Sequence, residues 1–150
     1  MNILRRGIMA AVIVMAAVIA PVTQAAAAPA APGSQLVAWD DQTGAGLQAW
    51  ECSEFHICFW TGRNGTGSRC IWDIADPDWT SGGVVCSWAK TKNVASVMNL
   101  GTSSDGSTGV AYYTQTNYNS RIGCTRNQHG GNLAGTYQLR SHKWISGSCG

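Results

Sequence analysis

The six cysteines are the residues of this chain best suited to chemistry, and their even number favours disulfides. All six follow an N-terminal segment with the features of an export signal, and exported proteins keep few free thiols. Six cysteines permit several pairings. We favour the sequence neighbours, because each pair then closes a short loop worth about 2–4 kcal/mol. The predicted pairs are Cys52 with Cys58, Cys70 with Cys86, and Cys124 with Cys149.

Metal binding and catalysis have little support from residue types and spacing. No Cys-x-x-Cys pair occurs, and none of the three histidines stands at zinc-ligand spacing from paired cysteines. The chain has no Gly-x-Ser-x-Gly nucleophile motif and no acidic pair in a recognisable catalytic motif. Asp73, Asp76 and Asp78 are close in sequence, but they lack the glycine and the spaced glutamate of a calcium loop. We therefore expect a solvated turn there, and no catalytic residue, metal site or cofactor.

The first thirty residues predict a secretory signal peptide. Arg5 and Arg6 form a basic start, Gly7–Ala20 is apolar, and small residues with several Ala-x-Ala cleavage sites follow. The apolar run is shorter than the roughly 20 residues that a membrane span needs, and no stop-transfer pattern follows it. We expect export and cleavage between Ala26 and Ala31 rather than a membrane anchor.

The remaining chain is electrically neutral. Removing Arg5 and Arg6 reduces ten basic residues to eight, against eight acidic ones. Proteins that bind nucleic acids or anionic membranes usually carry an excess of basic residues, so we expect neither kind of partner. About 120 residues suffice for one core that buries roughly two-thirds of the unfolded surface. We divide the chain into a signal peptide (1–30), an N-terminal extension (31–48) and one extracellular, monomeric domain (49–150).

The stretch after Cys58 predicts two antiparallel strands joined by a tight hairpin. An apolar strand end runs into Asn64-Gly65 and then Gly67, residues that readily adopt positive φ angles. The following strand alternates, with Cys70 and Trp72 on one face, as a half-buried strand does.

The same pattern returns 53 residues later, which indicates an internally duplicated β unit. The corresponding positions are Trp60 and Tyr113, Asn64 and Asn117, Gly65 and Tyr118, and Gly67 and Ser120.

The rest of the chain predicts further short strands and no sustained helix, which is typical of an all-β sandwich or barrel. The strand candidates are Leu36–Trp39, Val84–Trp88, Val94–Leu100, Val110–Thr114, Arg121–Thr125 and Thr136–Arg140. A polar linker over Gly101–Gly109 joins the two copies, and Asn127–Asn132 is predicted as a glycine-rich loop.

Several short motifs together resemble one known family. They are the cysteine pair Cys52 and Cys58, Phe-Trp with a glycine seven residues after the Trp, the segment Asn93–Asn99, and the second aromatic motif. From Cys52 to Arg140 the chain is similar to actinobacterial βγ-crystallin-like proteins of the Streptomyces-type metalloproteinase inhibitor family. The resemblance implies a disulfide-bonded, double Greek-key sandwich.

In that family each Greek key has an aromatic, a second aromatic after four residues, and a glycine two positions further on. The resemblance therefore assigns the motif to Trp60, Asn64, Gly67, Tyr113, Asn117, Tyr118 and Ser120. The first copy has Gly65 in place of the second aromatic, and the second copy has Ser120 in place of the glycine. Related domains bind calcium through an acidic, Asn and Ser motif, of which Thr91–Ser96 retains only the final Ser, so we predict no such calcium site.

The resemblance also implies a function, the inhibition of a metalloproteinase by a rigid, extended loop in the second copy. A loop already held in its bound shape loses little entropy on docking. The corresponding candidate inhibitory residues are Ser103, Ser104, Asp105, Gly106, Gly109, Val110, Ala111 and Tyr112. No cysteine lies among them to brace the loop.

The seven tryptophans suggest an alternative, a cell-wall or carbohydrate-binding module, and a secreted antimicrobial protein is a third option. A sugar binder should expose two or three coplanar Trp rings. We expect the strand residues Trp60, Trp72 and Trp88 in the core. The loop residues Trp39, Trp79 and Trp144 are candidates for exposure. The implied partner is a secreted metalloproteinase or, in the alternative, a cell-wall glycan.

Overall fold

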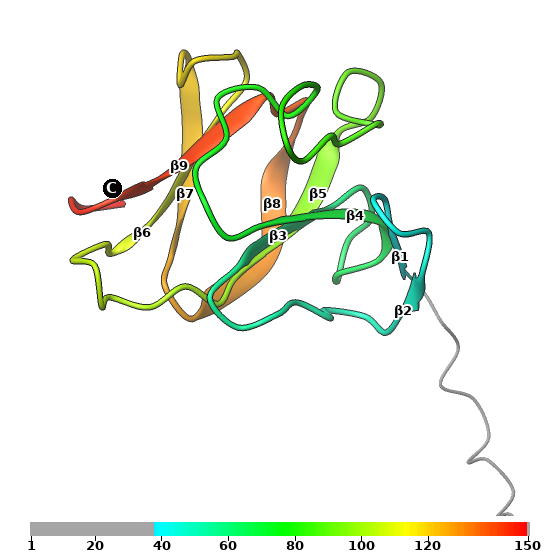
Figure 1. Ribbon diagram of the computed structural model, residues 1–150, viewed down its shortest axis with the longest axis horizontal. Helices are drawn as coiled ribbons and strands as arrows, with labels where there is room; N and C mark the ends of the chain where they lie inside the picture. The colour runs from blue at the N-terminus through cyan, green and yellow to red at the C-terminus, as the bar shows by residue number, and fades with distance from the viewer. Residues whose placement is uncertain (1–37, 150) are drawn as a thin grey trace, which may run out of the picture. The chain divides into compact units, whose positions relative to one another are not determined.

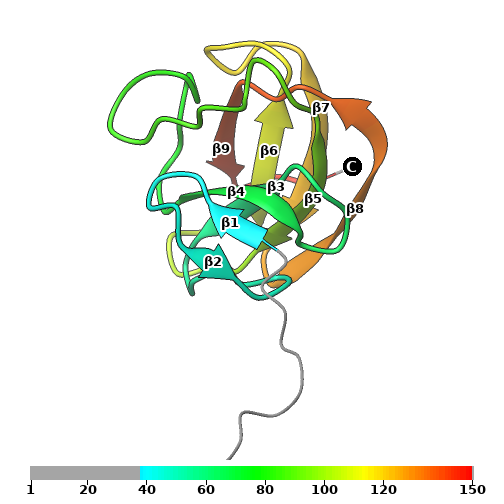
Figure 2. The ribbon, with the colours of Figure 1, turned by 90° about the vertical axis from the view of Figure 1, so that its right-hand side faces the viewer.

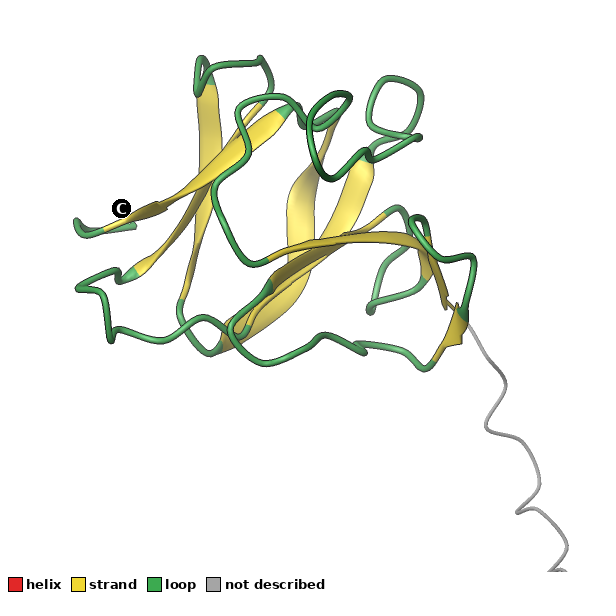
Figure 3. Cartoon of the chain, in the orientation of Figure 1, coloured by secondary structure: helices red, strands yellow, loops and turns green. Residues whose placement is uncertain are grey.

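The computed structural model describes residues 38–149, which form strands and loops without a helix (Figure 1, Figure 3). Six strands, in the order β2-β1-β4-β3-β5-β8, make one sheet, and β7-β6-β9 make a second. The strands are β1 (Ala38–Asp40), β2 (Gly46–Leu47), β3 (Ile57–Trp60), β4 (Gly67–Trp72), β5 (Val94–Asn99), β6 (Gly109–Tyr113), β7 (Arg121–Arg126), β8 (His129–Tyr137) and β9 (Ser141–Ile145). The all-β prediction is confirmed. In this part of the chain no helix could cross a membrane, and the predicted signal peptide lies outside it.

Each copy of the repeat contributes one segment to the sheet that is built mainly from the other copy. The strands β3, β4 and β5 come from the first copy, and β5 pairs with β8 of the second. The strands β6, β7 and β9 come from the second copy, and Asp76 of the first copy makes a β-bridge to His142 of β9. This exchange makes the sheets one interlocked domain with a shared core.

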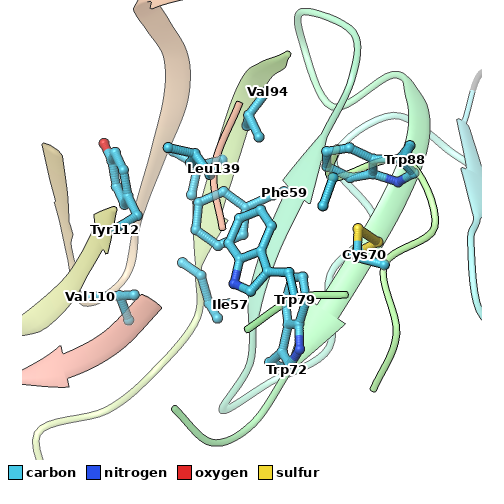
Figure 4. Packing of buried hydrophobic residues seen from close by; sticks show 13 residues of the cluster. Ile57, Phe59, Cys70, Trp72, Trp79, Trp88, Val94, Val110, Tyr112 and Leu139 are labelled. Atoms are coloured by element: carbon cyan, nitrogen blue, oxygen red, sulfur yellow. A yellow bond between two sulfur atoms is a disulfide. The ribbon is translucent and has the colours of Figure 1, made fainter. Parts of the chain in front are cut away.

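An aromatic core lies between the sheets. Phe59 of β3 contacts Tyr112 of β6 edge to face, with ring centroids 5.6 Å apart. Trp79, from the long connection between β4 and β5, stacks on Trp72 at 4.6 Å and is fully buried. Figure 4 shows Trp79, Trp72 and Phe59 packed together, with Leu139 and Val94 beside them. The apolar residues of β3 and β6 that alternate toward the core therefore hold the sheets together.

The opposite face of β3 is covered by the N-terminal strands. Trp60 and Cys58 pack against Ala38 of β1 and Leu47 of β2. The strand β1 pairs in parallel with β4 at one end of the large sheet (Figure 2). Residues 38–40 and 46–47 therefore pack on the large sheet, and the division into an extension over 31–48 and a domain over 49–150 stays a prediction. The strand predicted over Leu36–Trp39 overlaps β1 at Ala38 and Trp39, whereas the two residues of β2 are too few to give a periodic signal.

The two predicted hairpins have the same backbone conformation. Positive φ angles occur at Asn64, Gly65 and Gly67 in the first copy, at 58°, 68° and 77°. The corresponding residues of the second copy, Asn117, Tyr118 and Ser120, have φ angles of 55°, 59° and 59°. The second hairpin thus adopts the left-handed conformation without a single glycine, which is unfavourable for Tyr118 and Ser120. Tertiary contacts must offset that cost.

One buried serine braces each hairpin. The Ser96 hydroxyl of β5 accepts a hydrogen bond from Gly65 N (3.1 Å) and donates one to Gly62 O (2.7 Å). The Ser141 hydroxyl of β9 makes the equivalent bonds, from Tyr118 N (3.1 Å) and to Gln115 O (2.6 Å). The motif reasoning recognised Ser96 but missed Ser141, because Ser141 is 45 rather than 53 positions further along the chain.

Replacing Ser141 with alanine should destabilise the domain by about 1–3 kcal/mol, because a backbone N–H and a carbonyl lose their buried partner. Ser96→Ala should have a similar effect on the first hairpin. Urea unfolding measures both, with Ser53→Ala at an exposed serine as the matched control. A loss below about 0.5 kcal/mol in both variants, the range of ordinary surface substitutions, would contradict the bracing role.

Three predicted elements differ in the structure. Val84–Trp88 is not a strand, because Cys86 is bonded to Cys70 and Trp88 begins a turn to Lys92. The predicted glycine-rich loop over Asn127–Asn132 is instead a turn followed by the start of β8. Gly130 pairs with Met98 there, and a Cβ would lie 2.7 Å from the Met98 sulfur, so close packing explains the glycine. The predicted strand Thr136–Arg140 spans the end of β8, and β9 was not predicted.

The three disulfides are the predicted ones. Cys52 is bonded to Cys58, Cys70 to Cys86, and Cys124 to Cys149. The second disulfide anchors the long β4–β5 connection to the core. The third ties the chain after β9 to β7. All six cysteines are therefore structural.

Candidate functional site

The predicted inhibitory stretch divides into a buried strand and an exposed turn. Its second half is β6, the central strand of the small sheet, in which every residue is buried. Gly109, Val110, Ala111 and Tyr112 pair with β7 on one side and β9 on the other. These four residues offer a partner little surface, because their backbone and side chains are already used within the domain, and their part in binding stays a prediction.

The exposed half is a tight turn over Ser103–Gly106. Gly106 N donates a hydrogen bond to Ser103 O (3.0 Å), and Gly106 has a φ of 81°. Ser103, Ser104, Asp105 and Gly106 are all exposed. This turn differs from the extended, substrate-like segment that the resemblance implies. A turn closed by its own hydrogen bond is nevertheless held in one shape before any partner binds.

Hydrogen bonds from side chains brace the turn. The Asp105 carboxylate accepts a bond from Ser107 N (2.9 Å), and bonds from Ser107 hold the pKa of Asp105 below its usual value. The Ser107 hydroxyl donates to Thr102 O (3.1 Å), and Asn127 Nδ2 donates to Ser107 O (2.9 Å). Asp105 is therefore a fixed negative charge at the tip of the turn.

Two amide side chains, one buried and one exposed, support the chain just before the turn. The fully buried Asn99 donates to Thr125 O (2.9 Å) and accepts from Gly101 N (2.9 Å). Gln128 Nε2 donates to Gly101 O (2.8 Å). These amides brace the segment in place of a cysteine. The motif reasoning missed these two residues, because Asn99 and Gln128 are far apart in the sequence. Both reach Gly101 only when β5 and the β7–β8 turn come together in the fold.

The C-terminal segment braces the other end of the stretch. Thr108 Oγ1 donates to Gly147 O (2.6 Å), and Thr108 N donates to Ile145 O (2.7 Å). The Cys149 sulfur lies so close to Gly109 that a Cβ there would be 2.8 Å from it. The Cys124–Cys149 disulfide thus packs against the strand that follows the turn.

Tryptophan exposure does not match the sugar-binding alternative. All seven tryptophans lie in the described residues, and only Trp39 is largely exposed, at 52%. Trp60, Trp72 and Trp88 are buried, as expected. Trp79 is fully buried, which corrects the expectation that it is a candidate for exposure. No pair of exposed, coplanar Trp rings is therefore present between residues 38 and 149.

The aspartates after β4 have structural partners rather than the solvated positions expected for them. The Asp76 carboxylate is buried and accepts a hydrogen bond from Trp72 Nε1 (2.8 Å), and burial raises its pKa. Asp78 pairs with Arg140 (2.8 Å), and this contact holds the pKa of Asp78 well below its usual value. Only Asp73 of the three is exposed. This arrangement stabilises the β4–β5 connection against β9.

One cluster of metal-ligand types occurs among residues 38–149, formed by Asp41, Cys70 and Cys86. Its two cysteines are joined in a disulfide, so their sulfurs are not thiolate ligands. The Asp41 carboxylate accepts hydrogen bonds from Ser87 N (2.6 Å) and Ser87 Oγ (2.8 Å). The cluster therefore links the N-terminal strands to the β4–β5 connection.

Comparison with known proteins gives a family. Residues 45–125, more than half of the chain, match peptidase inhibitor family I36. This match agrees with the resemblance seen in the sequence. A search of curated proteins found no match. Among solved structures, geodin, a βγ-crystallin from Geodia cydonium, is similar with a TM-score of 0.39 and 13% identity. The similarity covers 61% of this chain and 49% of geodin, so the chain spans about half the length of that protein.

Proposed function

Because the chain belongs to peptidase inhibitor family I36, we propose that it is a secreted inhibitor that blocks a metalloproteinase with the turn Ser103–Gly106. The chain is then a binding protein and not an enzyme, in keeping with its family. One chain binds one enzyme molecule outside the cell, where the three disulfides are stable.

The observation that carries this proposal is the combination of exposure and bracing in the turn. Four consecutive residues are exposed, while Ser107 N donates to the Asp105 carboxylate and Asn127 in turn donates to Ser107 O. A partner that binds this turn does not pay the entropy of ordering it. Rigidity also disfavours cleavage, because a peptidase needs an extended, adaptable segment in its active site, and a turn closed by hydrogen bonds resists that shape.

The purified, oxidised domain should inhibit a thermolysin-like metalloproteinase with one-to-one stoichiometry, and reduction of its disulfides should abolish inhibition. Ser104→Trp should weaken inhibition by roughly tenfold or more, because a bulky side chain at the tip disturbs a fitted contact. Ser81→Trp, at an exposed serine of a different loop, is the matched control and should inhibit normally. Titration of enzyme activity against inhibitor concentration gives both quantities.

Two results would overturn the proposal. The first is full enzyme activity in the presence of folded, oxidised protein at micromolar concentration. The second is equal inhibition by Ser104→Trp and the unaltered chain, which would show that the turn does not contact the enzyme.

A further inference from the structure

Phe55 is the most exposed aromatic side chain between residues 38 and 149, at 60%. It lies in the loop closed by the Cys52–Cys58 disulfide, directly before β3. Single exposed apolar side chains are common on protein surfaces, so exposure alone assigns no role to Phe55, and its backbone conformation and neighbours decide the matter. The motif reasoning used the two cysteines of this loop and passed over the phenylalanine between them.

The loop holds Phe55 in a rigid and unfavourable backbone conformation. Its φ is 66°, in the left-handed region that favours glycine or asparagine and disfavours an aromatic residue. Phe55 N donates a hydrogen bond to Leu100 O (3.0 Å), and Leu100 N donates to His56 O (2.8 Å). The disulfide and these two bonds fix the backbone position from which the exposed ring projects. Folding alone gives no reason for a phenylalanine at this position.

Two surface hollows adjoin at Phe55 and connect it to the turn Ser103–Gly106. A hollow of about 410 Å³ is lined by Phe55, Thr102 and Gln128 together with Glu54 and Leu100. A second, of about 180 Å³, is lined by Phe55, Thr102, Asp73, Gly101, Ser104, Asp105 and Trp144. The phenylalanine and the turn therefore border the same hollow. A partner that contacts Ser104 and Asp105 also reaches the ring of Phe55.

The residues that line these hollows carry negative charge only. Glu54, Asp73 and Asp105 are all exposed, and neither hollow has a Lys or Arg among its lining residues. The surface thus combines one projecting apolar ring with three carboxylates. Such a surface is complementary to an apolar pocket with basic groups at its rim.

We propose that Phe55 is the anchor of the inhibitory surface and enters an apolar pocket of the target peptidase that has basic groups at its rim. This inference rests on the proposed function and extends it from one segment to two, the turn and the disulfide loop. The partner is the peptidase rather than a second copy of this chain. A symmetric contact between two copies would bring their carboxylates face to face, and like charges in an interface oppose binding.

The test replaces Phe55 with glycine, which suits the positive φ and removes the ring. Phe55→Gly should keep or raise the melting temperature and should raise the inhibition constant by roughly 30-fold or more, as the loss of a central aromatic anchor does. Phe55→Leu should retain part of the affinity. Val85→Ala, at an exposed apolar side chain that lines neither hollow, is the matched control and should inhibit normally.

The charge of the surface is tested by association kinetics. The association rate of the unaltered chain should fall as the salt concentration rises, and the double variant Glu54→Gln, Asp73→Asn should lower the rate at low salt about tenfold. An association rate that does not change with salt concentration would contradict the proposal that the peptidase pocket has basic groups at its rim.

The outcomes separate this inference from the proposed function. Inhibition by the unaltered chain together with equal inhibition by Phe55→Gly would overturn the anchor and leave the inhibitor function standing. No inhibition and no binding by the unaltered chain would overturn both. Weakened inhibition by Phe55→Gly with an unchanged melting temperature would support the anchor, because loss of folding could not explain it.

Discussion

Replacing Trp79 with alanine should destabilise the domain by about 4 kcal/mol or more, the largest effect that we expect of any single substitution. Trp79 is fully buried, stacks on Trp72 at 4.6 Å and contacts Phe59 at 4.8 Å. Removal of a buried indole leaves a large cavity, and such truncations cost about 3–5 kcal/mol. The substitution also removes the hydrogen bond from Trp79 Nε1 to His142 Nδ1 (2.8 Å), which leaves a buried nitrogen without its donor.

Chemical unfolding followed by circular dichroism measures this loss. Trp79→Phe separates the two contributions, because it fills much of the cavity but cannot donate the hydrogen bond. It should cost about 2 kcal/mol. Trp39→Ala, at the exposed tryptophan of β1, is the control and should change stability little. A loss below about 1.5 kcal/mol for Trp79→Ala would contradict the central role of this residue.

The second large effect is a loss of stability in mild acid that depends on His142. Trp79 Nε1 can only donate, so His142 Nδ1 must accept, and His142 Nε2 therefore carries the proton and donates to Ile74 O (3.0 Å). Burial lowers the pKa of His142 from 6.5 to about 3 and outweighs the bond to Ile74, which raises it. Protonation of His142 would bury a positive charge. It would also place an Nδ1–H donor opposite the Nε1–H donor of Trp79.

The sign of the effect follows from these two pKa values. Above pH 6.5 the imidazole is neutral in both folded and unfolded chains, so its contribution to stability is complete. As the pH falls from 6.5 towards 3, the unfolded chain binds a proton that the folded chain does not bind, and stability is lost at about 1.4 kcal/mol per pH unit. The whole loss is on the order of 5 kcal/mol.

Aspartate carboxylates also change the stability of the domain at the acidic end of this pH range. Asp76 forms a backbone β-bridge with His142, and the pKa of the Asp76 carboxyl is raised. The folded chain therefore binds a proton at Asp76 more readily than the unfolded chain does. This binding offsets part of the loss of stability near pH 4. Asp78 and Asp40 have lowered pKa values and add to the loss at still lower pH. For Asp40, burial alone would raise the pKa, but hydrogen bonds from Arg69 and Thr43 outweigh it. The interval from pH 7 to pH 5 therefore isolates His142.

Urea unfolding at pH 7 and at pH 5 tests this prediction. The unaltered chain should lose about 2 kcal/mol between them. His142→Gln should be less stable at pH 7 but should lose much less on acidification, because its amide can accept from Trp79 and donate to Ile74 without titrating. Equal stability of the unaltered chain at the two pH values would contradict the assignment.

The two stability predictions concern the core, whereas the binding predictions concern loops at its margin. Phe55 and Ser103–Gly106 are both exposed and are held by hydrogen bonds to residues of neighbouring strands and turns. Substitutions there should change affinity without large changes in stability. That separation is expected when binding residues lie on loops supported by a rigid scaffold.

The sequence predicted most of the repeated unit and little of what joins its two copies. The hairpins at Asn64 and Asn117 were predictable because turn residues act locally. The connection that carries Trp79 was not, because its residues form no regular element and are buried only by contacts with distant strands. The same reason explains why β9, with its buried His142, was missed. Its charged and polar residues have no apolar alternation, and the burial of His142 depends on contacts with Asp76 and Trp79, more than 60 residues away.

The all-β class, the three disulfide pairs and the duplicated hairpin followed from the sequence by itself, because each depends on residue types at short spacing. The inhibitor family followed from the resemblance of short motifs in the sequence to a known family. Only the tertiary structure decided which half of the predicted inhibitory stretch can meet a partner, since the burial of Gly109–Tyr113 comes from pairing with β7 and β9. It also decided that Phe55 lies beside the turn Ser103–Gly106. Those segments are nearly 50 residues apart in the sequence, and they adjoin because Leu100 hydrogen-bonds to the disulfide loop.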